Sequence, residues 1–72
     1  KLEYDGKGYY VIRNIYTKKV LDVQNAGMLS GTNVWQYDYN GTDSQKWIIK
    51  KTQAGYYNII SKLHQYLFIC LT

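Results

Sequence analysis

Hydrophobic and polar positions alternate along the chain in short runs that end at turn residues. The first run covers residues 9–15 and is rich in β-branched and aromatic side chains. A polar turn at residues 17–19 separates it from the second run, Val20-Leu21-Asp22-Val23. Two such runs around a short polar turn predict a pair of strands joined as a hairpin.

The later runs follow the same pattern. Residues 34–39 predict a third strand and residues 47–50 a fourth, with turn-rich segments at residues 25–27, 30–33 and 40–43. Residues 56–61 and 66–71 predict another hairpin. No segment has the period of a long amphipathic helix, and the longest helix that we expect is one turn at residues 42–45. The pattern therefore predicts an all-β fold.

The opening pattern of the chain recurs 47 residues later. Gly8-Tyr9-Tyr10-Val11-Ile12 aligns with Gly55-Tyr56-Tyr57-Asn58-Ile59, and the match continues at residues 20–23 and 66–69 after a deletion of one residue. A period of this length is typical of solenoids, propellers and trefoils. We predict residues 1–7 as the tail of a preceding repeat, residues 8–54 as one full repeat, and residues 55–72 as the first hairpin of the next.

The length of the chain limits its stability. Seventy-two residues make one small domain, whose core rarely supplies more than about 3–5 kcal/mol. Cys70 is the only cysteine, so the chain has no internal disulfide. We expect self-association or further repeats to add stability, because an incomplete barrel exposes strand edges and the apolar residues Leu67, Phe68, Ile69 and Leu71.

Charge and motifs argue against several classes of function. The nine basic residues, which give a formal charge of +4, are scattered rather than gathered in a stripe, so no nucleic acid partner is expected. No apolar run is long enough to span a bilayer, so no membrane insertion is expected. The single histidine, His64, is interpreted as an exposed turn residue. No catalytic, metal-ligating or phosphate-binding motif occurs, and we expect no enzymatic activity, metal or cofactor.

An ordered set of motifs points to a family. Leu21-Asp22-Val23 is followed by Gly31-Thr32-Asn33-Val34, by Tyr37 and by Gln45-Lys46-Trp47. This set resembles one repeat of the ricin B-type lectin family, also known as family-13 carbohydrate-binding modules. The resemblance implies a β-trefoil, in which three repeats of four strands form a six-stranded barrel capped by three hairpins. It also implies a secreted or extracellular, non-catalytic module that binds a galactose- or xylose-type glycan.

The resemblance also implies the residues of a carbohydrate site. Asp22 matches an aspartate that accepts hydrogen bonds from sugar hydroxyls, and Tyr37 matches a ring that stacks on the sugar. Ser44 stands before the motif glutamine, Gln45, where the family usually has asparagine. Independently of the family, a shallow sugar site needs a carboxylate, an amide or hydroxyl, and a flat ring. Asp22, Ser44 or Asn40, and Tyr37 supply these groups.

Structural roles compete with these assignments. Trp47 is expected in the core and Gln45 is expected to brace the preceding turn. The alternative for Asp22 is a solvent-facing strand residue, and for Tyr37 a ring packed against a neighbouring hairpin. If the two form a sugar site, replacing either with alanine is expected to weaken binding and barely change folding. Four further tyrosines are expected to pack: Tyr9, Tyr10, Tyr56 and Tyr57.

Trp35 stands where the family often has glutamine, and Phe68 replaces the aspartate in the second copy. These departures favour an alternative, a structural or protein-interaction repeat with a decayed site. A third hypothesis, binding of sulphated glycans, rests on the dispersed lysines alone.

Overall fold

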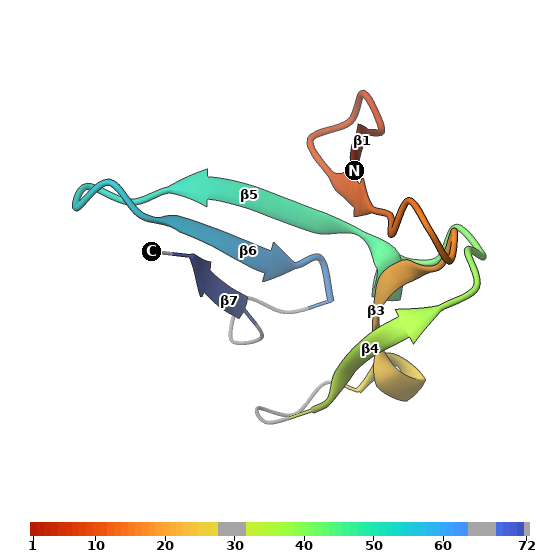
Figure 1. Ribbon diagram of the computed structural model, residues 1–72. Coiled ribbons are helices and arrows are strands. Elements are labelled where there is room, and N and C mark those ends of the chain that lie inside the picture. Colours follow the sequence, from red (N-terminus) through yellow and green to blue (C-terminus); the bar gives the residue numbers. More distant parts are fainter. Residues whose placement is uncertain (28–31, 64–67, 72) are drawn as a thin grey trace.

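The computed structural model describes residues 1–27, 32–63 and 68–71, the last segment as backbone. The described part consists of strands and two single 3-10 turns (Figure 1). In chain order they are β1 (Leu2–Tyr4), β2 (Tyr10–Ile12), β3 (Val20–Val23), η1 (Gln24–Ala26), β4 (Val34–Tyr37), η2 (Asp43–Gln45), β5 (Trp47–Lys51), β6 (Tyr57–Ser61) and β7 (Phe68–Leu71). The predicted all-β class is confirmed, and η2 lies where one helical turn is expected.

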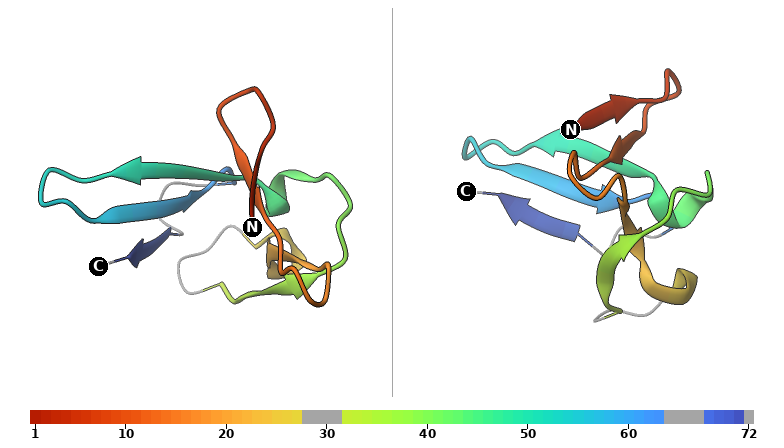
Figure 2. Two further views of the ribbon diagram at one scale, coloured as in Figure 1. Left: turned by 45° about the horizontal axis from the view of Figure 1, so that its top comes forward. Right: turned by 45° about the vertical axis from the view of Figure 1, so that its right-hand side comes forward.

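The strands form two sheets. Five antiparallel strands lie in the order β1-β2-β5-β6-β7, and β3 pairs with β4 in a separate two-stranded sheet. The views in Figure 2 show the β5–β6 hairpin reaching away from the β3–β4 hairpin. No helix in the described part is long and apolar enough to cross a membrane.

The first predicted hairpin is only partly correct. Its turn forms, because the Asn14 side chain accepts the backbone N–H groups of Tyr16 and Thr17. Its ladder is limited to one bridge, Arg13 to Val20. Strand β2 instead pairs with β1 and β5, and β3 leaves this sheet to pair with β4.

Other boundaries also differ from the pattern-based prediction. Strand β4 ends at Tyr37 rather than at residue 39, because the chain then turns so that the backbone N–H of Asn40 donates to the Gln45 side chain. Tyr56 and Tyr57, which the pattern suggests as packing residues, are both exposed. Several predicted features lie outside the described residues: Ser30, Gly31, His64, Tyr66, Leu67 and the side chains of Phe68, Ile69 and Leu71.

The 47-residue spacing of the sequence recurs in the backbone pairing. The pairs Leu2↔Ile12, Glu3↔Val11 and Tyr4↔Tyr10 join β1 to β2, and the pairs Ile49↔Ile59, Lys50↔Asn58 and Lys51↔Tyr57 join β5 to β6. Every residue of the second set lies 47 positions after its counterpart. Strands β5 and β6 therefore repeat the arrangement of β1 and β2, while the exact limits of each repeat stay a prediction.

The turns before β2 and β6 repeat as well. Gly8 and Gly55 both have positive φ, at 99° and 87°, a conformation that glycine adopts without the steric cost of a Cβ. The Asp5 carboxylate accepts the N–H of Tyr9, and the Thr52 hydroxyl accepts the N–H of Tyr56 47 residues later. The same turn is thus closed by two different polar side chains.

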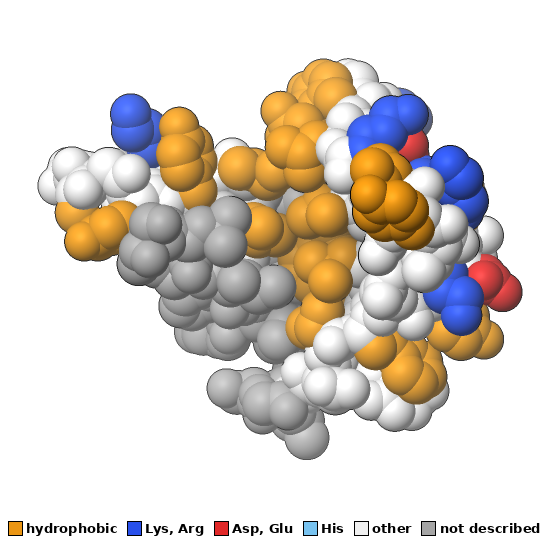
Figure 3. Space-filling model, viewed as in Figure 1, with side chains coloured by type: hydrophobic (Ala, Val, Ile, Leu, Met, Phe, Trp, Pro, Cys, Tyr) orange, Lys and Arg blue, Asp and Glu red, His pale blue; other side chains and the backbone are white. Residues whose placement is uncertain are grey.

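The core is small and centres on Trp47. Trp47 and Val23 are fully buried, and partly buried side chains pack around them: Ile12, Leu21, Val34, Ile59 and Leu63. The Trp47 indole also donates a hydrogen bond of 3.1 Å to the Leu21 carbonyl. The predicted core role of Trp47 is confirmed. Hydrophobic side chains also form a band down the middle of the face shown in Figure 3.

Candidate functional site

A cavity of about 290 Å³ lies between the β3–β4 hairpin and the turns η1 and η2. Its lining includes four of the five predicted site residues, Asp22, Tyr37, Asn40 and Ser44. This volume is close to the lower end of typical small-molecule sites. The fold therefore brings together residues that are up to 22 positions apart in the sequence, from Asp22 to Ser44.

The register of β3 and β4 places the carboxylate and the rings on one face. Asp22 lies directly opposite Trp35 in the antiparallel pair. Because side chains alternate between the faces of a strand, Tyr37 lies on the same face as Trp35. Leu21, Val23 and Val34 lie on the other face and pack in the core. One hairpin thus serves both the core and the cavity.

Asp22 is buried and firmly held. Asp22 is only 5% exposed, so the alternative that it faces solvent is wrong. Trp35 Nε1 donates to its Oδ1 at 2.8 Å, and Gln45 Nε2 donates to its Oδ2 at 2.9 Å. A carboxylate oxygen accepts about two hydrogen bonds, so each oxygen keeps acceptor capacity for a ligand. Loss of Asp22 would leave two donors without their acceptor, so the structure favours a loss of stability over the barely changed folding that the sequence predicts.

Gln45 lies beneath the cavity rather than in its lining. It is fully buried, its Oε1 accepts the Asn40 N–H at 2.8 Å, and its Nε2 also donates to the Asp38 carbonyl at 2.8 Å. Its predicted role in bracing the preceding turn is confirmed. The geometry gives it no direct access to a ligand in the cavity, and it acts on the site by orienting Asp22.

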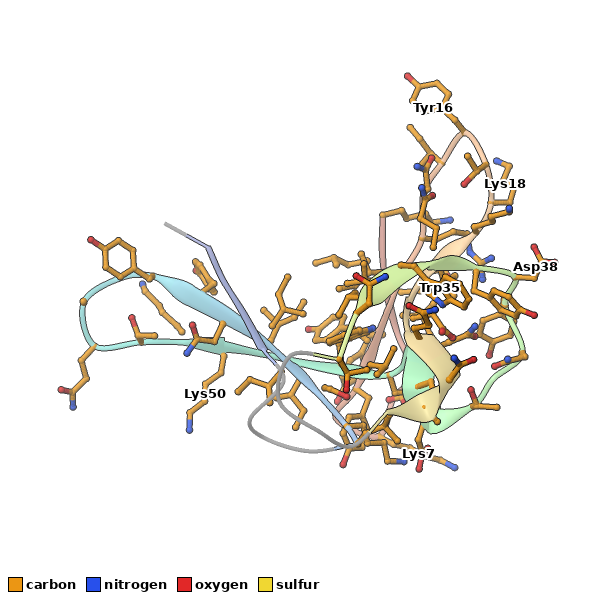
Figure 4. The ribbon with its side chains drawn as sticks, turned by 90° about the horizontal axis from the view of Figure 1, so that it is seen from below. Lys7, Tyr16, Lys18, Trp35, Asp38 and Lys50 are labelled. Carbon is orange, nitrogen blue, oxygen red and sulfur yellow. The ribbon has the colours of Figure 1, made fainter. Side chains whose placement is uncertain are left out.

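Two aromatic rings stand together in the cavity wall. The rings of Trp35 and Tyr37 stack at a centroid distance of 5.4 Å with only 10° between their planes. Tyr37 is 48% exposed, which leaves ring surface for a ligand. In Figure 4, Trp35 lies among the crowded side chains near β4, whereas Asp38 points away from the fold. The sequence does not predict the hydrogen bond from Trp35 to Asp22. It does place Trp35 two residues before Tyr37 in a predicted strand, which indicates that the two rings share one face.

Ser44 and Asn40 supply polar groups near the carboxylate. Ser44 is 8% exposed and lines the cavity. Asn40 Oδ1 accepts hydrogen bonds from the backbone N–H and the hydroxyl of Thr42. These bonds orient the Nδ2 group, which donates to no other described residue. A hydroxyl and an amide are therefore available beside Asp22.

Another part of the wall comes from a strained turn that the sequence does not reveal as part of the site. Asn25 and Ala26 in η1 have φ angles of 55° and 51°, in the left-handed region. Asparagine tolerates this region better than alanine, for which it is uncommon. Both residues line the cavity. Strain of this kind is often found where the backbone shapes a binding site.

The charged groups with displaced pKa values lie elsewhere. The Arg13 guanidinium donates two hydrogen bonds to Glu3, and this pairing lowers the pKa of the Glu3 carboxyl and raises that of Arg13. Arg13 also lies beside a second, smaller hollow of about 210 Å³. Because Arg13 additionally donates to the Lys18 carbonyl and lies over the Tyr39 ring, its role is to tie β1 to the neighbouring turns. No group of three or more potential metal ligands occurs in the part of the chain that the structure describes.

Comparisons with known proteins agree with the geometry. Residues 1–71 match the family model described as ricin-type beta-trefoil lectin domain-like. Among solved structures, the chain is similar to a designed three-fold symmetric protein, ThreeFoil, with 37% identity and a TM-score of 0.85 over 90% of this chain and 46% of that one. The chain thus spans less than half the length of that protein. A search of curated proteins found no match. The protein belongs to the ricin-type β-trefoil lectin family and forms part of a β-trefoil domain.

Proposed function

We propose that the chain is a non-catalytic carbohydrate-binding module with one shallow site for a galactose- or xylose-type glycan. The observation that carries this proposal is the buried Asp22 carboxylate, held by two donors next to an exposed ring. A carboxylate fixed in this way accepts hydrogen bonds from adjacent sugar hydroxyls without losing side-chain entropy on binding. The family membership supports carbohydrate binding in general.

The other wall residues complete the chemistry of a sugar site. The Tyr37 ring offers a flat apolar surface to the C–H face of a pyranose, and Ser44 and Asn40 offer a hydroxyl and an amide. A site this open stays wet, so we expect a weak, millimolar affinity, which corresponds to about −4 kcal/mol. Several such sites acting together would bind a multivalent glycan much more tightly. A secreted or extracellular location, where such glycans occur, forms part of this proposal.

The proposal is tested by titrating the protein with galactose, lactose and xylo-oligosaccharides while following the backbone amide resonances of Asp22 and Tyr37. We expect both to shift with a common dissociation constant. Tyr37→Ala should weaken binding about fivefold by removing the stacking surface. Tyr57→Ala is the matched control, because Tyr57 is exposed to nearly the same extent, 46% against 48%, but lies outside the cavity.

The competing function is a structural or protein-interaction repeat. Its support is that both Asp22 oxygens already accept hydrogen bonds within the chain. In that case no sugar would move the Asp22 and Tyr37 resonances at tens of millimolar. Self-association forms part of this alternative and is measured on the same sample by sedimentation.

A further inference from the structure

Asp22 is a buried carboxylate whose hydrogen-bond partners are neutral. Its two donors are the indole of Trp35 and the amide of Gln45. The ion pairs within the described chain involve other carboxylates, Glu3 and Asp43. Burying a charge without an opposite charge is costly even when hydrogen bonds remain. Among the described residues, Asp22 on the cavity floor has no cationic partner in an ion pair.

We propose that the cavity prefers a sugar that carries a protonated primary amine, such as a 2-amino-2-deoxyhexose, over the corresponding neutral sugar. This inference rests on the proposed carbohydrate-binding function and specifies its ligand class. The ammonium group would donate to the free acceptor positions of Asp22 and supply the missing positive charge. A neutral hydroxyl also donates to a carboxylate, but an ammonium adds the attraction between two opposite charges.

The aromatic wall supports the same ligand class. A cation within about 6 Å of a ring face is attracted by the negative potential of the ring. Trp35 and Tyr37 line the cavity together with Asp22, so an ammonium bound to the carboxylate lies near two aromatic side chains. The rings thus serve two parts of one ligand, its C–H face and its charged nitrogen.

The lining also disfavours acidic sugars. Among the described residues that line the cavity, none is a lysine or an arginine. A sulphated or uronic sugar would therefore place a second negative charge near Asp22 with no cation to offset it. The positive formal charge of the chain, +4, resides outside this site. This charge distribution argues against the sulphated-glycan hypothesis at this cavity.

The experiment compares three ligands by calorimetric titration of the whole chain at about pH 6, where an alkyl amine is protonated. The ligands are galactosamine, galactose and N-acetylgalactosamine, the last of which keeps the nitrogen but lacks its charge. We expect galactosamine to bind about tenfold more tightly than either neutral sugar. Added salt should reduce this preference, because it screens the attraction between ammonium and carboxylate.

Two variants locate the preference. Asp22→Asn removes the charge and should abolish the preference for galactosamine, whereas Asp38→Asn makes the same change at an exposed carboxylate outside the cavity and should preserve it. If Asp22→Asn does not fold, the N-acetylated ligand and the salt series decide on the unaltered protein. Equal affinity for all three sugars would overturn the amine preference and leave the proposed function intact. Absence of binding by any of them would overturn both.

Discussion

The two copies of the repeat share a turn and a pairing register but use the following strand differently. In both copies a glycine with positive φ precedes two tyrosines, and the strand that follows pairs with the strand before it in the same register. In the first copy the next strand, β3, departs to pair with β4. In the second copy the next strand, β7, stays along β6 at four paired positions.

The two copies also differ in polarity at two aligned positions. Asp22 in β3 aligns with Phe68 in β7, and only Asp22 has the polar partners Trp35 and Gln45. Val11 in the first copy is a buried core residue. Asn58 lies 47 positions later, and its buried side-chain oxygen has no hydrogen-bond partner among described residues. The two copies therefore share the chemistry of their turns, whereas the carboxylate at the cavity is replaced by an apolar side chain at the aligned position, Phe68.

The largest effect is expected from Trp47→Ala. The indole is fully buried between the two sheets and donates to the Leu21 carbonyl, so its removal creates a cavity and leaves an acceptor unpaired. We expect the free energy of unfolding to fall by about 3–5 kcal/mol. Chemical denaturation measures this change, with Tyr16→Ala, at an 89% exposed residue, as the control. Similar losses from both variants would contradict the placement of Trp47 in the core.

Gln45→Ala should reduce both stability and sugar affinity, which a matched change next to the second copy should not. The substitution removes hydrogen bonds to Asp22, Asn40 and Asp38 at once, and we expect a loss of about 2–3 kcal/mol in the free energy of unfolding. Sugar affinity should fall with it, because Asp22 loses its orientation. Gln53→Ala, at an exposed glutamine before the second copy, should change neither quantity. Unchanged sugar affinity in Gln45→Ala would show that Asp22 needs no bracing.

Asn58→Val makes the second copy more like the first. It replaces a buried, unpaired oxygen with the apolar residue found at Val11, so the free energy of unfolding should rise by about 1 kcal/mol. The same denaturation experiment measures the gain. The reverse change, Val11→Asn, should destabilise the protein. A loss of stability in Asn58→Val would indicate that the Asn58 side chain has a necessary polar partner.

The smallest effect concerns pH. The hydrogen bond from Arg13 lowers the pKa of Glu3 below its ordinary value of 4.5, so the ionised carboxyl stabilises the fold at higher pH. This contribution is lost as the pH falls from about 4.5 through the lowered pKa. Glu3→Gln should therefore reduce the acid-induced loss of stability. Part of that loss should persist in the variant, because the pKa of Asp5 is also lowered. An identical pH dependence in both proteins would contradict this role of Glu3.

The sequence predicted the all-β class, the approximate positions of β2 to β7, the 47-residue spacing and the buried Trp47, because these follow from local alternation and turn residues. The family resemblance also indicated Asp22, Tyr37 and Ser44 as site residues, the chemistry of sugar binding indicated Asn40, and all four line the cavity. The sequence did not predict that β3 leaves β2, which depends on pairing between strands far apart in the chain. Nor did it predict the hydrogen bond from Trp35 to Asp22 or the left-handed turn at Asn25, because both depend on register and backbone angles.

The two tryptophans provide the most direct test that the Asp22 cavity is the carbohydrate site. The Trp35 indole N–H donates to Asp22 at the cavity, whereas the Trp47 indole N–H donates to Leu21 in the core, and each gives its own resonance in a nitrogen-proton correlation spectrum. During titration with galactose, we expect the Trp35 signal to shift and saturate while the Trp47 signal stays in place. An unmoved Trp35 signal, or equal shifts of both, would contradict this assignment of the site.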